Sequence, residues 1–95
     1  MPRYLVERSF TEGSWNPCEA SATSCRLIVE NNSLEQVCWL HSYVAMDGQL
    51  STCICDAPSP EAIRRAANRN RLPISRITEV RVLTPYSYTG PCRPK

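Results

Sequence analysis

Alternating apolar and polar residues mark three stretches of this chain as β-strands. Residues 3–10 alternate and carry aromatic and β-branched side chains, residues 36–44 are rich in the same types, and residues 76–83 alternate again. A period of two is typical of a strand with one buried face. The pattern therefore predicts strands at 3–10, 36–44 and 76–83.

A hairpin signal follows the second of these strands. Asp47-Gly48 is the strongest short hairpin dipeptide, and a type I′ turn centred on it predicts a further strand after Gly48. That register places Tyr43 opposite Thr52, His41 opposite Ile54 and Trp39 opposite Asp56. Opposed residues share a sheet face. One face should carry Trp39, His41, Tyr43, Thr52, Ile54 and Asp56, and the other Cys38, Leu40, Ser42, Cys53 and Cys55.

Two helices are predicted from their start signals. Asn16-Pro17-Cys18-Glu19 offers an N-cap, a proline at the first helical position and an early carboxylate, and Asn31-Asn32-Ser33 should end that helix. Its apolar stripe would be Cys18, Ala22, Cys25 and Val29. The second helix should open at Pro58-Ser59-Pro60-Glu61 and stop at Leu72-Pro73. Its buried stripe would be Ile63, Ala66, Ala67 and Asn70, with Arg64, Arg65 and Arg69 toward solvent.

This order of elements predicts a ferredoxin-like βαββαβ fold of the α+β class, a four-stranded antiparallel sheet with two helices on one face. We expect one domain over residues 1–88 and a C-terminal tail over 89–95. Trp39, Tyr43 and Ile54 would leave the other sheet face more apolar than a soluble monomer usually tolerates. Face-to-face homodimerisation is the simplest way to cover it.

Composition narrows the function classes. Eleven basic residues against nine acidic ones give a net charge of +2 over 95 residues, which is too weak for a nucleic-acid footprint. The first residues place a charge inside their short apolar stretch, unlike a signal peptide, and no apolar run would span a bilayer. We therefore expect a cytoplasmic protein without a membrane partner, whose six cysteines are reduced rather than paired.

The only histidine, His41, is the first candidate for chemistry. On the predicted register it lies near Tyr43 and Asp56, and Glu7 and Glu79 could point to the same face. Imidazole with carboxylates suits a divalent transition metal such as nickel, zinc or copper, and a dimer would bring a second His41 close. The competing interpretation is a half-buried strand histidine whose nitrogens Tyr43 or a carboxylate satisfies.

Sulfur is the second candidate. Cys38, Cys53 and Cys55 should share the helix-facing side, where Cys18 and Cys25 would also pack. Zinc sites usually use C-x2-C on a turn, which this chain lacks, so the cysteines fit core packing better than a metal site. An enzymatic alternative is a cofactor-free oxygenase or isomerase that uses His41, Tyr43 and a carboxylate as acid and base in a dimer pocket.

Three stretches resemble a known family: Trp39-Leu40-His41-Ser42-Tyr43-Val44, residues 53–64, and Ile77-Thr78-Glu79-Val80. The family comprises small, mostly bacterial proteins of unassigned function, one of them described as nickel-binding, and the resemblance covers residues 3–88. It implies ferredoxin-like chains that dimerise into an α/β barrel, and His41 is the first residue to carry over as a metal ligand. Cys18, Cys38, Cys92 and the tail beyond Tyr88 depart from the family pattern and leave a thiol or redox role open.

The sequence as a whole predicts a small dimeric protein that binds Ni(II) or another divalent transition metal through His41, Glu7, Glu79, Tyr43 and Asp56. Two alternatives stay open. One is a dimeric α/β-barrel protein, or cofactor-free enzyme, with a small-molecule pocket on the sheet face. The other is a purely structural interaction module.

Overall fold

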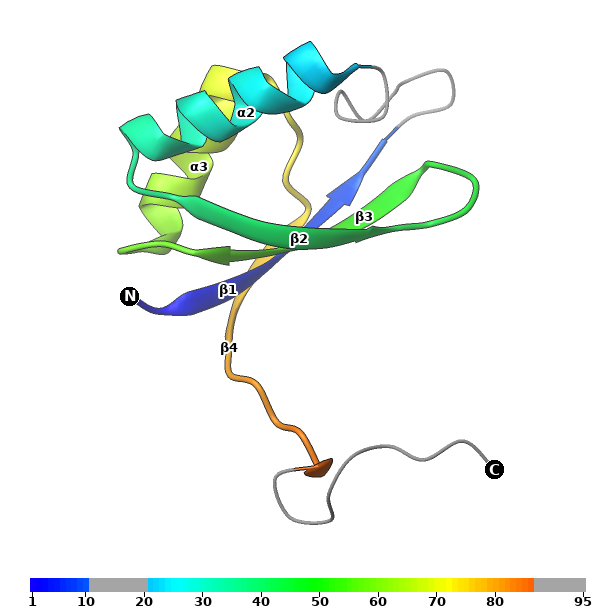
Figure 1. The fold of residues 1–95 in the computed structure, drawn as a ribbon, viewed down its shortest axis with the longest axis vertical. Coiled ribbons are helices and arrows are strands. Elements are labelled where there is room, and N and C mark those ends of the chain that lie inside the picture. The colour runs from blue at the N-terminus through cyan, green and yellow to red at the C-terminus, as the bar shows by residue number, and fades with distance from the viewer. Residues whose placement is uncertain (11–20, 87–95) are drawn as a thin grey trace.

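The computed structural model describes residues 1–10 and 21–86. All strand pairings are antiparallel, and the sheet order is β2-β3-β1-β4. Both described helices lie on one face of the sheet (Figure 1). The elements are β1 (Arg3–Ser9), α2 (Ala22–Leu34), β2 (Cys38–Val44), β3 (Leu50–Asp56), α3 (Pro60–Asn70) and β4 (Arg76–Val80). The predicted ferredoxin-like α+β fold is confirmed.

Helix α3 begins where the sequence predicted. The Oγ of Ser59 accepts a hydrogen bond of 3.2 Å from the Ala62 N–H, and Pro60 occupies the first turn. This cap satisfies a backbone donor that the helix itself leaves free. The helix buries Ala62, Ile63, Ala66 and Ala67. Three small residues on that stripe let the helix approach the sheet closely.

Helix α2 differs from its prediction in two ways. Its N-cap is Ser21, whose Oγ accepts from the Ser24 N–H, and the predicted start at 16–19 lies outside the described residues. Its inward side chains are Ile28 and Asn32, whereas Val29 is 48% exposed, so the predicted stripe is wrong there. The asparagines do not end the helix, because the buried Asn32 amide has a partner in α3.

Two polar contacts tie α2 to α3. The amide of Asn70 accepts a hydrogen bond from Asn31 at 2.9 Å and donates one to Asn32 at 3.0 Å. One turn further, the carboxylate of Glu35 pairs with Arg65 and Arg69. The helix pair is therefore held in register by specific polar contacts, while its apolar side chains pack on the sheet.

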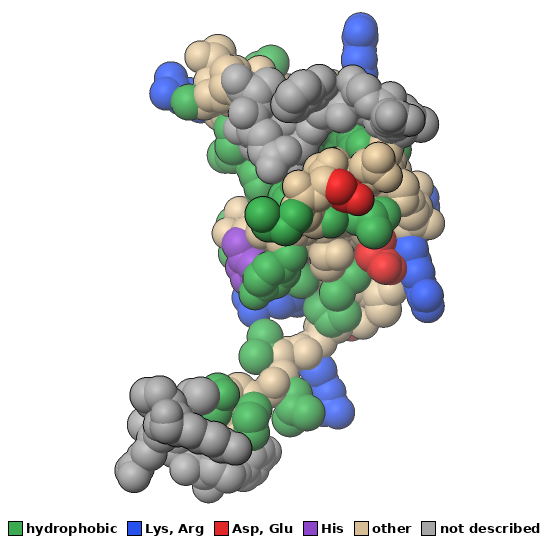
Figure 2. All heavy atoms as spheres, turned by 90° about the vertical axis from the view of Figure 1, so that its right-hand side faces the viewer, with side chains coloured by type: hydrophobic (Ala, Val, Ile, Leu, Met, Phe, Trp, Pro, Cys, Tyr) green, Lys and Arg blue, Asp and Glu red, His purple; other side chains and the backbone are tan. Residues whose placement is uncertain are grey.

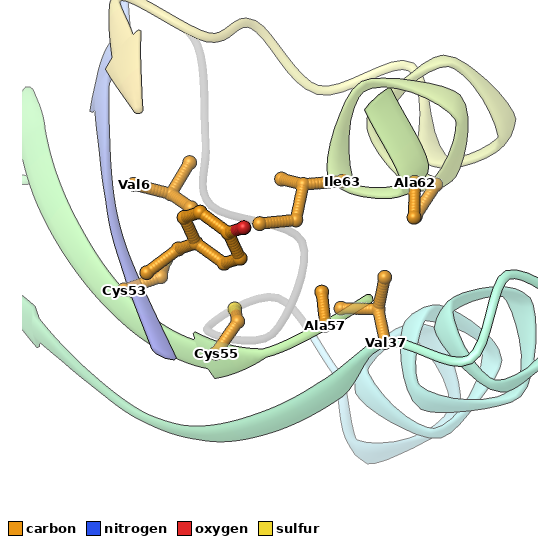
Figure 3. Packing of buried hydrophobic residues seen from close by; sticks show 9 residues of the cluster. Val6, Val37, Cys53, Cys55, Ala57, Ala62 and Ile63 are labelled. Atoms are coloured by element: carbon orange, nitrogen blue, oxygen red, sulfur yellow. The ribbon is translucent and has the colours of Figure 1, made fainter. Parts of the chain in front are cut away.

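The core lies between the helices and the sheet. Val6 and Ala57 are fully buried, Ile63 is 2% exposed, and Cys53 and Cys55 are buried beside them (Figure 3). These free cysteines pack as small apolar side chains, as predicted.

The hairpin keeps its predicted register near the turn but not its predicted turn type. Tyr43 pairs with Thr52 and His41 with Ile54. Gly48 adopts φ +76° and Asp47 does not enter the left-handed region, so the turn is not type I′. The Asp47 carboxylate accepts instead from the Gln49 N–H at 2.9 Å, and the Gly48 N–H donates to the Ala45 carbonyl at 2.8 Å.

A β-bulge changes the register further along β2. The pairing shifts between Trp39 and His41, so Trp39 lies opposite Cys55, and Cys38 lies opposite Asp56. The predicted pairing of Trp39 with Asp56 is therefore wrong. One extra residue reverses the sides of all residues beyond it. Trp39 therefore packs against the core and Cys38 is exposed, whereas a strand without a bulge would place them on the opposite sides. Leu40, predicted to face the helices, is 40% exposed.

Strand β4 is shorter than predicted. It ends at Val80, which pairs with Arg3, the first residue of its partner strand β1. The chain over residues 81–86 then runs away from the sheet (Figure 1), with Val82 and Leu83 largely exposed. The predicted tail at 89–95 lies outside the described residues. No described helix is long and apolar enough to cross a membrane.

Candidate functional site

We call the sheet side that α2 and α3 do not cover the open face. Along each strand its residues alternate with the buried ones. Their cross-strand partners lie on the same face. Figure 2 shows hydrophobic side chains gathered beside the imidazole, drawn in purple. The open face carries Arg3, Leu5, Glu7, Ser9, Cys38, His41, Tyr43, Leu50, Thr52, Ile54, Asp56, Arg76, Thr78 and Val80.

His41 and Tyr43 are neighbours on the open face, as predicted. Their rings meet edge to face with centroids 5.4 Å apart. Both side chains are exposed, Tyr43 to 69%, because β2 is an edge strand. The imidazole is thus oriented by an aromatic contact and remains accessible to a ligand.

Asp56 reaches the open face but is already engaged. Its two carboxylate oxygens accept from Arg3 at 2.8 and 3.2 Å, a bidentate ion pair between β1 and β3. The hydrogen bonds and charge of Arg3 lower the pKa of this carboxyl. A metal ion at Asp56 would have to compete with Arg3, a partner that the sequence analysis did not identify. Cross-strand register is the signal that would have found it, since Arg3 lies directly opposite Asp56.

The two glutamates are separated by the sheet. Glu7 lies on the open face, in one row with Thr52 and Tyr43. Glu7 is on β1 and His41 is on β2, and β3 lies between these strands, so their backbones are roughly 10 Å apart. Glu79 pairs with Tyr4, a buried residue, and therefore lies on the helix side. The expectation that Glu79 points toward His41 is wrong, because the β1–β4 register sets its side.

The predicted metal ligands therefore converge only in part. His41 and Tyr43 lie together, Asp56 is held by Arg3, and Glu7 stands two strands away. Among the described residues, no three His, Cys, Asp or Glu side chains form a metal-binding group. One chain thus supplies a single imidazole at this face, and any further ligands must move or come from elsewhere.

The cysteines divide between the two sides of the sheet. Cys53 and Cys55 are buried on the helix side and Cys25 of α2 is partly buried, as predicted, but Cys38 lies on the open face beside Asp56. Cys18 lies outside the described residues. Among the described residues, Cys38 is therefore the one that departs from the expected convergence of thiols, and the part of that prediction that concerns Cys18 is untested. Burial raises the pKa of the Cys55 thiol to about 12.

Comparison with known proteins identifies the family. A family model described as "Nickel responsive protein SCO4226-like" matches residues 4–80. The chain is also similar to a solved structure described as "Crystal structure analysis of SCO4226 from Streptomyces coelicolor A3(2)", with 16% sequence identity and a TM-score of 0.70. That match covers 86% of this chain and 99% of the other, and at this identity it supports the fold. No curated protein matches the chain. The protein belongs to the SCO4226-like family of nickel-responsive proteins.

Proposed function

We propose that this protein binds a divalent metal ion of the nickel type at the open face, in a homodimer whose two open faces meet. The observation that carries the proposal is His41, the only histidine, which is exposed on that face and held edge to face by Tyr43. Neutral imidazole is a preferred ligand of nickel and its neighbours in the transition series. The nickel-responsive description of the family supports the same ion class.

The surface of the open face supports the dimer. Leu5, Ile54 and Tyr43 stand on adjacent strands of this face without cover from the helices. Covering such a face with a second copy removes apolar surface from water, and a two-fold axis through the interface would pair like residues. Two His41 imidazoles would then serve one ion or two adjacent ions, which compensates for the single histidine of each chain.

The remaining ligands are proposed in a definite order. Tyr43 contacts His41, and Asp56 lies two residues beyond Ile54, the cross-strand partner of His41. Glu7 would have to come from across the sheet or from the partner. Asp56 must first release Arg3. Glu79 is left out because it lies on the helix side.

We also propose that residues 1–88 form the domain, that 89–95 form a separate tail, and that the protein acts in the cytoplasm.

The test is nickel titration of tag-free protein by calorimetry, with light scattering to follow the oligomer. We expect stoichiometric binding in the wild type and its loss in His41→Ala, with the dimer retained in both. Glu79→Gln is the matched control and should bind as the wild type does, whereas Glu7→Gln should bind more weakly if the partner supplies Glu7. Binding that survives in His41→Ala would refute the site, and a monomer at micromolar concentration would refute the dimer.

One observation favours a second candidate, a small-molecule site. A hollow of about 310 Å³ lies at one end of the open face, where Glu7, Thr52 and Arg76 line it. This volume falls at the lower end of ligand pockets, and the lining offers both signs of charge. Native mass spectrometry of freshly purified protein tests this candidate, because a retained organic molecule would favour it and a retained metal ion would favour the first.

A further inference from the structure

A small cavity lies on the helix side of the sheet, opposite the proposed nickel site. Its volume is about 30 Å³, which accommodates a few water molecules or an ion but no organic cofactor. Most of its wall is apolar and comes from residues of the core. Its polar or polarisable groups include Arg8, Ser51, Cys53 and Cys55.

The two thiols of this cavity stand side by side. Cys53 and Cys55 are two residues apart on β3, so their backbones are about 7 Å apart on the same face. Both are free and buried, with exposed fractions of 8% and 4%. The sulfur of Cys55 points into the space between the sheet and α3 (Figure 3). Two buried sulfur atoms at this spacing suit an ion that takes few, soft ligands.

The Ser51 hydroxyl gives an independent indication of a ligand. Ser51 is 3% exposed, and its buried Oγ has no hydrogen-bond partner among residues 1–10 and 21–86. Native structures rarely leave such a group unpaired unless it serves a ligand, an ion or a water molecule. Ser51 lies two residues before Cys53 on the same face and lines the same cavity. Its hydroxyl is therefore an unused donor in the wall of the cavity that holds the two thiols.

Arg8 supplies the charge that two thiolates would need. It lies opposite Ser51 in the β1–β3 register and lines the cavity. One guanidinium nitrogen donates to the Pro73 carbonyl at 2.7 Å, which fixes the group and leaves further N–H donors. The charge of Arg8 also lowers the pKa of Cys55, against the larger effect of burial. A monovalent ion with two thiolates carries one negative charge, which one guanidinium balances.

We propose that Cys53 and Cys55 bind one soft monovalent ion of the Cu(I) class in this cavity, with Ser51 and Arg8 stabilising the bis-thiolate. Binding forms two metal–sulfur bonds and releases two protons, one from each thiol, and the oxidation state of the ion does not change. The site lies on the other side of the sheet from His41. It is therefore independent of the proposed nickel site.

Silver(I) is the probe, because it is a soft monovalent ion that is stable in air. The first variant replaces Cys18, Cys25, Cys38 and Cys92 by Ala and keeps the proposed pair, and the second replaces Cys53 and Cys55 by Ala as well. We expect the first variant to bind one silver ion per chain, with release of two protons near neutral pH. Affinity should fall at least a hundredfold in the second variant, and X-ray absorption of the first should show two sulfur neighbours.

Cys55→Ser, introduced into the first variant, provides a further test if the second variant unfolds, since serine preserves the volume and removes the soft ligand. It should lose silver binding while circular dichroism stays unchanged. Silver binding of equal affinity with and without the pair, or a spectrum with oxygen and nitrogen neighbours alone, would overturn the proposal. His41→Ala should leave silver binding intact, so failure here and failure of the nickel site are separately observable.

Discussion

Trp39 donates a hydrogen bond of 2.8 Å from its indole Nε1 to the Oγ of Ser42. Residues three apart in a regular strand lie on opposite faces, so this contact exists only because a β-bulge falls between them. The bulge brings both side chains to the helix side, where Trp39 packs against the core. The hydrogen bond lets a half-buried indole N–H stay paired.

Ser42→Ala should therefore destabilise the fold by about 1–3 kcal/mol, because the indole N–H loses its partner in a partly buried place. Urea unfolding followed by circular dichroism measures the change. The control is Ser75→Ala, because the exposed Ser75 hydroxyl donates only a long hydrogen bond of 3.4 Å to Ser9 within the described chain. It should shift stability by less than about 0.5 kcal/mol. Equal effects of the two variants would show that the Trp39 contact contributes nothing.

The ion pairs of Glu35 should make stability depend on pH. Hydrogen bonds from Arg65 and Arg69, at 2.8 and 3.0 Å, lower the pKa of Glu35 in the folded state. A depressed carboxyl pKa stabilises the fold above the unfolded value of about 4.3, and this contribution is lost as pH falls through the folded pKa.

Glu35→Gln should accordingly be less stable than the wild type at pH 7, and the difference should be smaller at pH 3. Urea unfolding at both pH values tests this, and added salt should reduce the difference at pH 7. Glu30→Gln, an exposed position on the same helix, is the control and should show no such pattern. A constant difference between wild type and Glu35→Gln at both pH values would contradict the ion-pair explanation.

The cysteines should differ in reactivity with iodoacetamide. Burial raises the pKa of Cys55 to about 12, so very little of it is thiolate at pH 8, whereas Cys38 is exposed on the open face. The thiolate is the reactive form. We expect Cys55 to be alkylated at least about 100-fold more slowly than Cys38 in the native protein. Peptide mapping by mass spectrometry after timed labelling gives both rates, and labelling in concentrated urea should make them similar. Comparable native rates would mean that Cys55 is accessible.

Much of the fold could be predicted because its signals are local. The Ser59 cap with Pro60 set the start of α3, and Gly48 set the end of β2 and the register of His41 and Tyr43. These interactions involve residues within a few positions of each other, and the backbone chemistry of proline, glycine and serine is the same in any context.

Asn32 shows where local rules fail. Asparagine usually ends helices because its amide competes for the backbone, yet Asn32 lies inside α2 and is 8% exposed. Its amide accepts from Asn70, which is 38 residues away. The helix therefore continues to Leu34. The backbone enters the left-handed region only at Gln36, which adopts φ +61°.

The sequence by itself determined the order of elements, the start of α3, the local hairpin register and the position of His41 on the uncovered side of the sheet. Only the tertiary structure decided the bulge before His41, the exposure of Cys38, the pairing of Asp56 with Arg3 and the placement of Glu79 on the helix side. The physical reason is the period of two along a strand: a shift of one residue moves a side chain to the other face. For Glu79 the side depends on pairing with Tyr4 of β1, which is far away in the sequence, so no neighbouring residue indicates it.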